Sequence, residues 1–222
     1  MSQNVTKQPN QLNRKFWKWF FISSGVFLLF LFVLNMGWIG DMPDLDEIEN
    51  PTASLASQVY AQDGTPIGKF YLEDRISVKY RDISPYLIQA LVATEDKRFY
   101  DHYGIDGEGL IRAFAFLGSR GGASTITMQT AKNLFTDNWS TKNKLLRVIQ
   151  KIKESIIAIK LEKNFTKQEI VTLYLNTVPF SENLFGVSNA SRTFFQKEPD
   201  RLNIEEAALL IGMINAPTKY NP

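Results

Sequence analysis

The sequence predicts a mostly α-helical domain with a small β element, preceded by one transmembrane helix. Three observations predict this fold class. An uncharged run of 21 residues covers positions 19–39. Farther along, apolar residues recur at helical spacing in several segments, and most of these segments follow a residue that commonly caps helices. A single pair of β-prone runs surrounds an Asp-Gly step, which is typical of a hairpin or turn.

The run over 19–39 is predicted to cross a membrane. At about 1.5 Å per residue, a helix of this length matches a hydrocarbon core of about 30 Å. Arg14, Lys15 and Lys18 precede the run, and acidic residues follow it. Because basic flanks stay in the cytoplasm, residues 1–18 are predicted to form a cytoplasmic tail, with the rest of the chain outside. The alternative, a cleaved signal peptide, is disfavoured since the apolar run exceeds the usual length of about 7–15 residues.

The next segments lead into the domain. Residues 40–57 are acidic and contain two prolines, so we expect a linker there and the domain itself over 58–222. The β-prone residues 59–61 and 67–71 flank the Asp-Gly step and predict the hairpin or turn.

Start signals predict the helices of the domain. Ser84 as N-cap and Pro85 in the first turn predict a helix that ends near Glu95. Ser140 is expected to cap a long helix through about Lys163. The apolar stripe of this long helix is expected from Leu145, Val148, Ile149, Ile152, Ile156 and Ile159.

Two further helices are predicted by capping boxes, in which a capping residue precedes a glutamate by three positions. Thr166 and Glu169 predict a helix through about position 176. Asn203 and Glu206 predict a final helix, which Pro217 would stop.

Composition excludes several kinds of function. The chain has no cysteine, and its single histidine, His102, excludes a multi-histidine metal centre and argues against a Ser-His-Asp triad. Four of the 25 basic residues precede Asp41, so the rest of the chain holds 21 basic and 23 acidic residues. Since domains that bind nucleic acids usually carry a basic excess, no nucleic-acid partner is expected.

Glu95 is a candidate catalytic carboxylate. At the end of its predicted helix it would face the negative end of the helix dipole, with Asp96 adjacent and two aromatic residues following. These surroundings disfavour the ionised carboxylate, which suits a general base working near neutral pH. From this segment alone, an ordinary solvated or capping carboxylate remains the simpler alternative.

Residues 120–133 are a candidate phosphate site. Two glycines lead into Ser and Thr residues and then a predicted helix, and the free N–H groups at such a start bind anions well. The pattern is not that of a nucleotide-binding P-loop. An ordinary glycine hinge before a helix is the alternative.

Arg147, Lys151 and Glu154 share one face of the long helix because they are spaced at i, i+4 and i+7. The two cations suit a pyrophosphate, and the carboxylate suits a metal ion. The alternative is a solvated helix face with supporting ion pairs. His102 is likewise more typical of a structural hydrogen-bonding residue than of a catalyst.

Five motifs then connect these segments. Glu-Asp-x-x-Phe-x-x-His-x-Gly-x-Asp is complete over 95–106, and Gly-Ala-Ser-Thr-Ile-Thr-Gln-Gln-x-x-Lys-Asn follows over 122–133 with one change. Lys-x-x-Glu over 151–154, Glu-Ile-x-x-x-Tyr-Leu-Asn over 169–176 and the segment 202–222 complete the set. In this order the motifs resemble the glycosyltransferase domain of class A penicillin-binding proteins, the lysozyme-like family-51 peptidoglycan glycosyltransferases.

The resemblance implies a reaction. A lipid-linked glycan is the donor and lipid II the acceptor. Glu95 would take the proton of the acceptor 4-hydroxyl, which attacks the donor anomeric carbon. Polyprenyl pyrophosphate leaves, and a β-1,4 bond forms with inversion. Glu154 is implied as the second catalytic residue and as a possible ligand of a divalent cation such as Mg or Mn, while no organic cofactor is implied.

The resemblance also implies substrate contacts and a location. The implied contact residues are Asp96, Arg98, Phe99, His102, Arg112, Ser124, Thr125, Gln129, Lys132, Asn133 and Lys151. The implied location is the inner (cytoplasmic) membrane, with the domain in the periplasm, where the lipid substrates and other cell-wall synthesis proteins meet.

The sequence departs from the family pattern at three positions. Gln150 stands in place of an arginine, for which Arg147 is expected to compensate. Met128 replaces an amide, and Ser181 stands where a glycine is common. Because both glutamates are kept, we expect activity to survive, and it is donor affinity that these changes put in question.

Two other functions stay open. A lysozyme-like lytic enzyme would use Glu95 as an acid and would not need the phosphate segment. A membrane scaffold would bind lipid II without turnover. Neither Ser-x-x-Lys nor Lys-Thr-Gly occurs, so no peptide cross-linking is expected from these residues. The chain is expected to be part of a longer protein with a C-terminal transpeptidase domain, although a monofunctional enzyme is not excluded.

Overall fold

The computed structural model describes residues 11–38, 42–49, 57–60, 66–70, 76–116, 122–136, 143–181 and 184–214. Helices dominate these residues, and two small two-stranded sheets accompany them, which confirms the predicted fold class. The chain divides into two compact units, 1–42 and 43–222.

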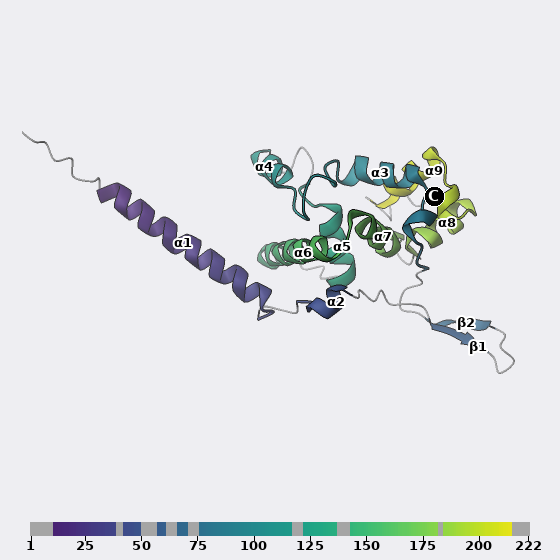
Figure 1. The fold of residues 1–222 in the computed structure, drawn as a ribbon, viewed down its shortest axis with the longest axis horizontal. Helices are drawn as coiled ribbons and strands as arrows, with labels where there is room; N and C mark the ends of the chain where they lie inside the picture. The colour runs from purple at the N-terminus through teal and green to yellow at the C-terminus, as the bar shows by residue number, and fades with distance from the viewer. Residues whose placement is uncertain are drawn as a thin grey trace, which may run out of the picture. The chain divides into compact units, whose positions relative to one another are not determined.

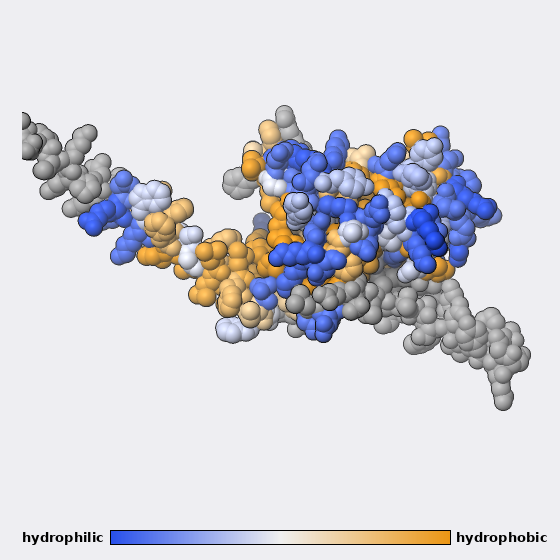
Figure 2. Space-filling view, viewed as in Figure 1, coloured by the Kyte–Doolittle hydropathy of each residue, from blue (hydrophilic) through white to orange (hydrophobic). Residues whose placement is uncertain are grey.

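Over its described residues, the first unit contains one helix, α1, Gln11–Asn35 (Figure 1). Its segment Asn13–Asn35 is long and apolar enough to cross a membrane, with a mean hydropathy of 1.9. Figure 2 shows the surface of this helix changing from hydrophilic at its start to hydrophobic farther along. The apolar run therefore forms the long helix that the sequence predicts.

Helix α1 ends before the predicted boundary at Ile39, which lies outside the described residues. The reason is Gly37, whose φ of 73° lies in the left-handed region. Its N–H donates to the carbonyl of Leu34 at 3.1 Å, and the N–H of Trp38 donates to that of Val33 at 3.3 Å. This pair of hydrogen bonds is a Schellman cap, which ends a helix at glycine.

The second unit holds the remaining elements. Its helices are α2 Leu45–Glu49, α3 Pro85–Glu95, α4 Gly107–Ala115, α5 Ile126–Phe135, α6 Lys144–Asn164, α7 Lys167–Thr177, α8 Val187–Phe195 and α9 Ile204–Ile214, with short 3-10 turns at Tyr80–Asp82 and Pro199–Arg201. Its strands are β1 Ser57–Tyr60, β2 Pro66–Phe70, β3 Pro179–Ser181 and β4 Leu184–Phe185.

Helix α5 packs against both α6 and α7, and α3 packs along α9 (Figure 1). The core lies among these helices, where Leu91, Tyr174, Leu175 and Leu210 are fully buried. Because α3 and α5 are both held by this core, the C-terminal end of α3 and the N-terminal end of α5 have fixed positions.

The capping boxes are confirmed. In α7, the Thr166 hydroxyl accepts from the N–H of Glu169, whose carboxylate accepts from the N–H of Thr166. In α9, Asn203 and Glu206 exchange the same two hydrogen bonds, at 3.0 and 2.9 Å. Pro217, expected to stop α9, lies outside the described residues.

Helix α3 has the predicted bounds, but its capping residue acts differently. Ser84 occupies the N-cap position without a capping hydrogen bond from its side chain. Its hydroxyl donates instead to the carbonyl of Leu202 at 2.8 Å, which ties the start of α3 to the segment before α9.

Two expectations for α6 are wrong. The helix begins at Lys144 with Asn143 as its cap, and Ser140 lies outside the described residues. The buried stripe consists of Glu154, Ile157, Ala158 and Leu161. The expected stripe is rotated from it, and Leu145, Val148 and Ile159 are exposed by 67%, 55% and 38%. Since α6 is apolar on more than one face, its periodicity alone does not tell which face meets α5.

The region before α3 also differs in part. The expected linker contains α2, where Asp44 and Glu47 cap each other's backbone N–H groups at 2.8 and 3.2 Å. Strands β1 and β2 pair antiparallel, as predicted, and the turn at 61–65 lies outside the described residues. Helices α4 and α8 and the β3–β4 pair were not predicted.

Candidate active site

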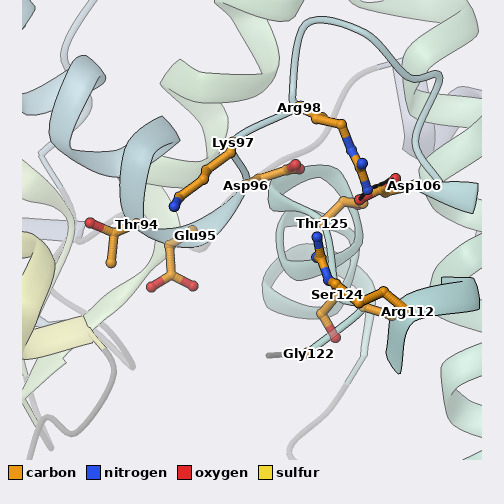
Figure 3. Close-up of a pocket in the computed structure, with 11 residues that line it drawn as sticks. Thr94, Glu95, Asp96, Lys97, Arg98, Asp106, Arg112, Gly122, Ser124 and Thr125 are labelled. Carbon is orange, nitrogen blue, oxygen red and sulfur yellow. Dashed lines mark hydrogen bonds and ion pairs between the residues drawn. The ribbon is translucent and has the colours of Figure 1, made fainter. Parts of the chain in front are cut away.

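A cavity of about 430 Å³ lies where the end of α3, the loop after it and the start of α5 meet (Figure 3). Figure 3 shows Glu95 on one side of this cavity and Ser124 with Arg112 on the other. The lining residues are Thr94, Glu95, Asp96, Lys97, Arg98, Asp106, Arg112, Gly122, Ala123, Ser124 and Thr125. The structure thus brings the two strongest sequence motifs to one cavity.

Glu95 is the last residue of α3, as predicted. One of its oxygens, Oε2, accepts a hydrogen bond from Nε2 of Gln129 in α5 at 3.0 Å. The other amide atom of Gln129 accepts from the hydroxyl of Tyr174 in α7 at 3.1 Å. Burial, together with the negative charge of Glu95, raises the pKa of Tyr174, so this phenol remains protonated. Glu95 is therefore held by a chain of side chains from three helices.

Asp96 joins the first motif to the second. Its carboxylate is buried, and Oδ2 lies 3.0 Å from Nε2 of His102. The same oxygen accepts from the backbone N–H of Ile126 at 3.1 Å. Ile126 is the first residue of α5, so a carboxylate sits at the positive end of this helix. Asp96 lines the cavity, yet its hydrogen bonds go to protein atoms that fix the start of α5.

Phe99 and His102 anchor the loop that follows Glu95 and do not line the cavity. Phe99 is fully buried in the core. The ammonium of Lys167 lies 4.4 Å from the centroid of the Phe99 ring and donates to the carbonyl of His102 at 2.6 Å. Phe99 is fully buried and His102 is 9% exposed, and their expected substrate contacts remain a prediction.

The surroundings of Gly104 explain why the first motif has a glycine at this position. Its φ is 87°, and a Cβ there would come within 2.9 Å of the backbone of Ala158 in α6. The carbonyl of Gly104 accepts from the hydroxyl of Thr125 at 2.6 Å. Thr125 also caps α5 by accepting from the N–H of Met128 at 3.1 Å. Only glycine permits this close approach of the loop to α6, and Thr125 links the loop to α5.

Arg98 lines the cavity but is held by carboxylates of the protein. It contacts both oxygens of Asp106, at 2.6 and 2.7 Å, and also contacts Glu108. The hydrogen bond to Asp106 raises the pKa of Arg98. Burial acts to raise the pKa of Asp106, but hydrogen bonds from Arg98 and from the N–H of Gly109 outweigh it and lower that pKa. A substrate phosphate would have to compete with Asp106 for this guanidinium.

Ser124 lies on the opposite side of the cavity and contacts Lys151, which pairs with Glu154, although neither Lys151 nor Glu154 is a lining residue. The ammonium of Lys151 donates to the hydroxyl of Ser124 at 3.1 Å and to the carboxylate of Glu154 at 2.7 Å. The side chain of Glu154 is 2% exposed and that of Lys151 is 52% exposed. The buried carboxylate therefore holds an accessible cation beside a hydroxyl that lines the cavity.

Glu154 does not fit a resident divalent cation in this arrangement. Its carboxylate already accepts from a cation, and Mg or Mn would have to displace or adjoin that ammonium. In the part of the chain that the structure describes, no group of three or more His, Cys, Asp or Glu side chains is placed to bind a metal.

Among the other expected contact residues, one lines the cavity and two do not. Arg112 lines it and is exposed. Lys132 and Asn133 lie toward the far end of α5, one turn beyond Gln129, and do not line the cavity. Arg147 is exposed in the first turns of α6 and is likewise not a lining residue. Compensation for Gln150 by Arg147 remains a prediction.

The Met128 departure lies away from the cavity. Met128 is 5% exposed, and its sulfur lies 4.0 Å from the hydroxyl of Ser155 in α6. An amide at this position would be buried between α5 and α6. The methionine therefore fills a packed site and removes no group from the cavity wall.

Several residues that the structure brings to the site have no predicted role. Thr94 and Lys97 line the cavity beside Glu95. Asp106 and Tyr174 lie on motif positions, and that placement was the signal that marked them. Their contacts with Arg98 and Gln129 join separate segments, which no local pattern reveals.

Comparison with known proteins agrees with this geometry. Residues 63–222 match the family described as Transglycosylase. Penicillin-binding protein 1A of Vibrio cholerae is 40% identical over 186 residues, that of Escherichia coli is 38% identical over 185, and that of Aquifex aeolicus is 40% identical over 187. Each match covers 82% of this chain but 22%, 21% and 25% of the relative, so the chain spans about a quarter or less of these relatives.

The family match covers well over half of the chain and includes every motif that lines the cavity. The chain therefore belongs to the transglycosylase family, the peptidoglycan glycosyltransferase domain of class A penicillin-binding proteins.

Proposed function

We propose that this chain polymerises lipid II into glycan strands by inverting glycosyl transfer. The observation that carries the proposal is one cavity with Glu95 on one side and Ser124 with Arg112 on the other, where the Ser124 hydroxyl accepts a hydrogen bond from Lys151. A base and a cation on opposite sides suit a displacement in which a hydroxyl loses a proton and a pyrophosphate leaves.

Glu95 acts on the acceptor. Its carboxylate takes the proton of the acceptor 4-hydroxyl as that oxygen attacks the anomeric carbon of the donor. The α bond from the anomeric carbon to the phosphate oxygen breaks, and its electron pair leaves with the polyprenyl pyrophosphate. Attack from the opposite face gives the β-1,4 linkage, which accounts for the inversion.

The cations act on the leaving group. A pyrophosphate is already a good leaving group, so it needs charge neutralisation more than a proton. Arg112 lines the side of the cavity opposite Glu95, and the half-exposed ammonium of Lys151 donates to Ser124 on that side. Ser124 supplies a hydroxyl beside that ammonium. No general acid is required on this side.

This arrangement favours transfer over lysis. A lytic enzyme breaks a bond between two sugars, and the departing sugar oxygen must receive a proton from an acid. On the side of the cavity opposite Glu95, where such an acid would be needed, lies the cation Arg112. Glu154 is buried and paired with Lys151, so it serves the cation rather than the sugar.

The orientation across the membrane belongs to the same proposal. The basic residues before α1 support a cytoplasmic N-terminus, and the domain would then lie on the periplasmic side of the inner membrane. The polyprenyl tails of both substrates are embedded in that membrane, so an anchored domain meets them at its surface.

The first prediction concerns Glu95→Gln. We expect this variant to lose polymerisation by roughly a hundredfold or more because the amide cannot take a proton. The measurement is glycan-strand formation from lipid II in detergent. Glu205→Gln is the matched control, since Glu205 is exposed at the start of α9 and does not line the cavity.

Other outcomes would point elsewhere. Full activity of Glu95→Gln would remove Glu95 as the base. Release of fragments from finished peptidoglycan by the unmodified chain, without synthesis from lipid II, would favour a lytic enzyme. Binding of lipid II with neither reaction would favour a scaffold.

A further inference from the structure

We propose that Tyr174 is a positioning residue for Glu95 and acts through the side-chain amide of Gln129. The inference rests on the proposed function, because it assumes that Glu95 is the base. The three side chains come from different helices, α7, α5 and α3, and meet in one hydrogen-bonded chain. Its two links are 3.1 Å from Tyr174 to Gln129 and 3.0 Å from Gln129 to Glu95.

The donor and acceptor groups of the three side chains fix the direction of both hydrogen bonds. An ionised carboxylate only accepts hydrogen bonds, so the amide of Gln129 must turn its NH₂ group toward Glu95. The amide oxygen then faces Tyr174 and can only be satisfied by a donor. The phenol is that donor. A phenylalanine at position 174 would leave the amide oxygen without this partner, and nothing would then fix which way the amide points.

Glu95 depends on this amide. Among the described residues, Gln129 is the one side chain that hydrogen-bonds the carboxylate of Glu95, and the second oxygen, Oε1, is buried without a partner. The orientation of the base therefore relies on a single hydrogen bond, whose donor is in turn held by Tyr174. A base must point at the proton that it removes, so a loosened amide lowers the rate of the chemical step.

Tyr174 is well placed for such a role. Its side chain is fully buried in the core, so its hydroxyl cannot swing away into solvent. Burial and the nearby carboxylate both raise its pKa, and the phenol thus remains a donor at any pH at which the protein works. Its ring packs among core residues, and this packing does not depend on the hydroxyl. A substitution can therefore remove the hydroxyl alone.

The test is the rate of lipid II polymerisation by Tyr174→Phe in the full chain. We expect kcat to fall about three- to tenfold, the effect of one lost hydrogen bond, with KM within twofold of the unmodified chain. A role in packing alone would lower the thermal midpoint without a change in kcat. Ser191→Ala in α8 is the matched control, because it also removes one buried hydroxyl, which donates to the carbonyl of Lys197 at 2.6 Å.

A double substitution tests the route through Gln129. Gln129→Met keeps the length of the side chain and removes both hydrogen bonds, so we expect a loss of kcat at least as large as that of Tyr174→Phe. Adding Tyr174→Phe to Gln129→Met should then change kcat no further. Independent, multiplying effects would overturn the inference. If Tyr174→Phe fails to fold, an unchanged kcat in Gln129→Met alone would also overturn it.

The Glu95→Gln variant separates this inference from the proposed function. An inactive Glu95→Gln with a fully active Tyr174→Phe would overturn the inference and leave Glu95 as the base. An active Glu95→Gln would overturn both. A loss of kcat in Ser191→Ala equal to that in Tyr174→Phe would assign the effect to general loosening of the core and would likewise overturn the inference.

Discussion

Lys151 serves two purposes at the residue scale. It neutralises Glu154, whose carboxylate would otherwise be buried alone, and it presents an ammonium to the hydroxyl of Ser124 at the cavity. A buried carboxylate without a partner is costly, whereas an exposed ammonium is well solvated. Under the proposed function, stability and activity depend on this side chain for different reasons, and substitutions can separate the two.

The second prediction, after that for Glu95→Gln, concerns Lys151→Met. We expect it to destabilise the fold by about 1–3 kcal/mol, because Glu154 loses its cation, and to abolish most polymerisation, because the leaving group loses its neutralising charge. Adding Glu154→Gln should restore the thermal midpoint, since a neutral amide needs no cation, while activity stays low. Thermal unfolding and lipid II polymerisation measure the two effects.

Lys144→Met is a suitable control for this pair, since Lys144 is exposed in the first turn of the same helix. An activity that recovers together with stability in the double variant would contradict the assignment of Lys151 to the leaving group.

At the element scale, the loop after α3 determines the geometry of the site. It begins at Asp96, passes through the anchors Phe99 and His102, and ends at Asp106. Lys167 in α7 donates to the carbonyl of His102 in this loop and also pairs with Glu162 of α6 at 2.8 Å. The loop is thus fastened to α5, α6 and α7, the helices that carry Gln129, Lys151 and Tyr174.

The third prediction concerns Gly104→Ala in this loop. A methyl group would meet the backbone of α6 at 2.9 Å and would stand at a φ of 87°, which costs a non-glycine residue about 1–3 kcal/mol before the clash is counted. We expect a lower thermal midpoint and a loss of activity, because the loop must move away from α6 and disturb Asp96. Circular dichroism on heating and polymerisation rates measure both.

Gly107→Ala provides the comparison. Gly107 begins α4, and a Cβ there would meet no atom within 4 Å. Alanine also favours a helix over glycine, so this variant should retain both stability and activity. Equal losses in the two variants would show that neither the clash nor the left-handed φ at Gly104 matters.

For the whole molecule, the proposed orientation across the membrane depends on α1. Helix α1 exposes large apolar side chains along most of its length, as a helix surrounded by lipid does. Basic residues lie in its first turns and none lies in its last turn. This asymmetry supports the proposed orientation.

Because the sequence has no cysteine, introduced cysteines can test this orientation. A single cysteine introduced as Asn13→Cys or as Glu205→Cys would be the only thiol in the chain. In intact spheroplasts, a membrane-impermeant maleimide should label the Glu205→Cys variant, while the Asn13→Cys variant should react only after lysis. The reverse pattern would overturn the orientation, and labelling of both before lysis would mean that α1 does not cross the membrane.

Several elements were predictable because their causes are local. Each local signal concerns residues that are close together in the sequence. Examples are the apolar run of α1, the capping boxes of α7 and α9, and the proline at the start of α3. Glu95 was likewise placed at a helix end by the signals of its own helix. The buried face of α6 was not predictable, because Leu145 and Ile157 are equally apolar and only the position of α5 decides which face is covered.

The sequence by itself determined the helical class, the apolar helix, the family motifs and the identity of Glu95 as the candidate base. These depend on residue type and spacing, which a chain carries before it folds. Only the tertiary structure decided that Phe99 and His102 anchor the loop, that Glu154 serves Lys151, and that Tyr174 reaches Glu95 through Gln129. The partners in these contacts come from different elements, and the packing of the helices alone sets the distance between them.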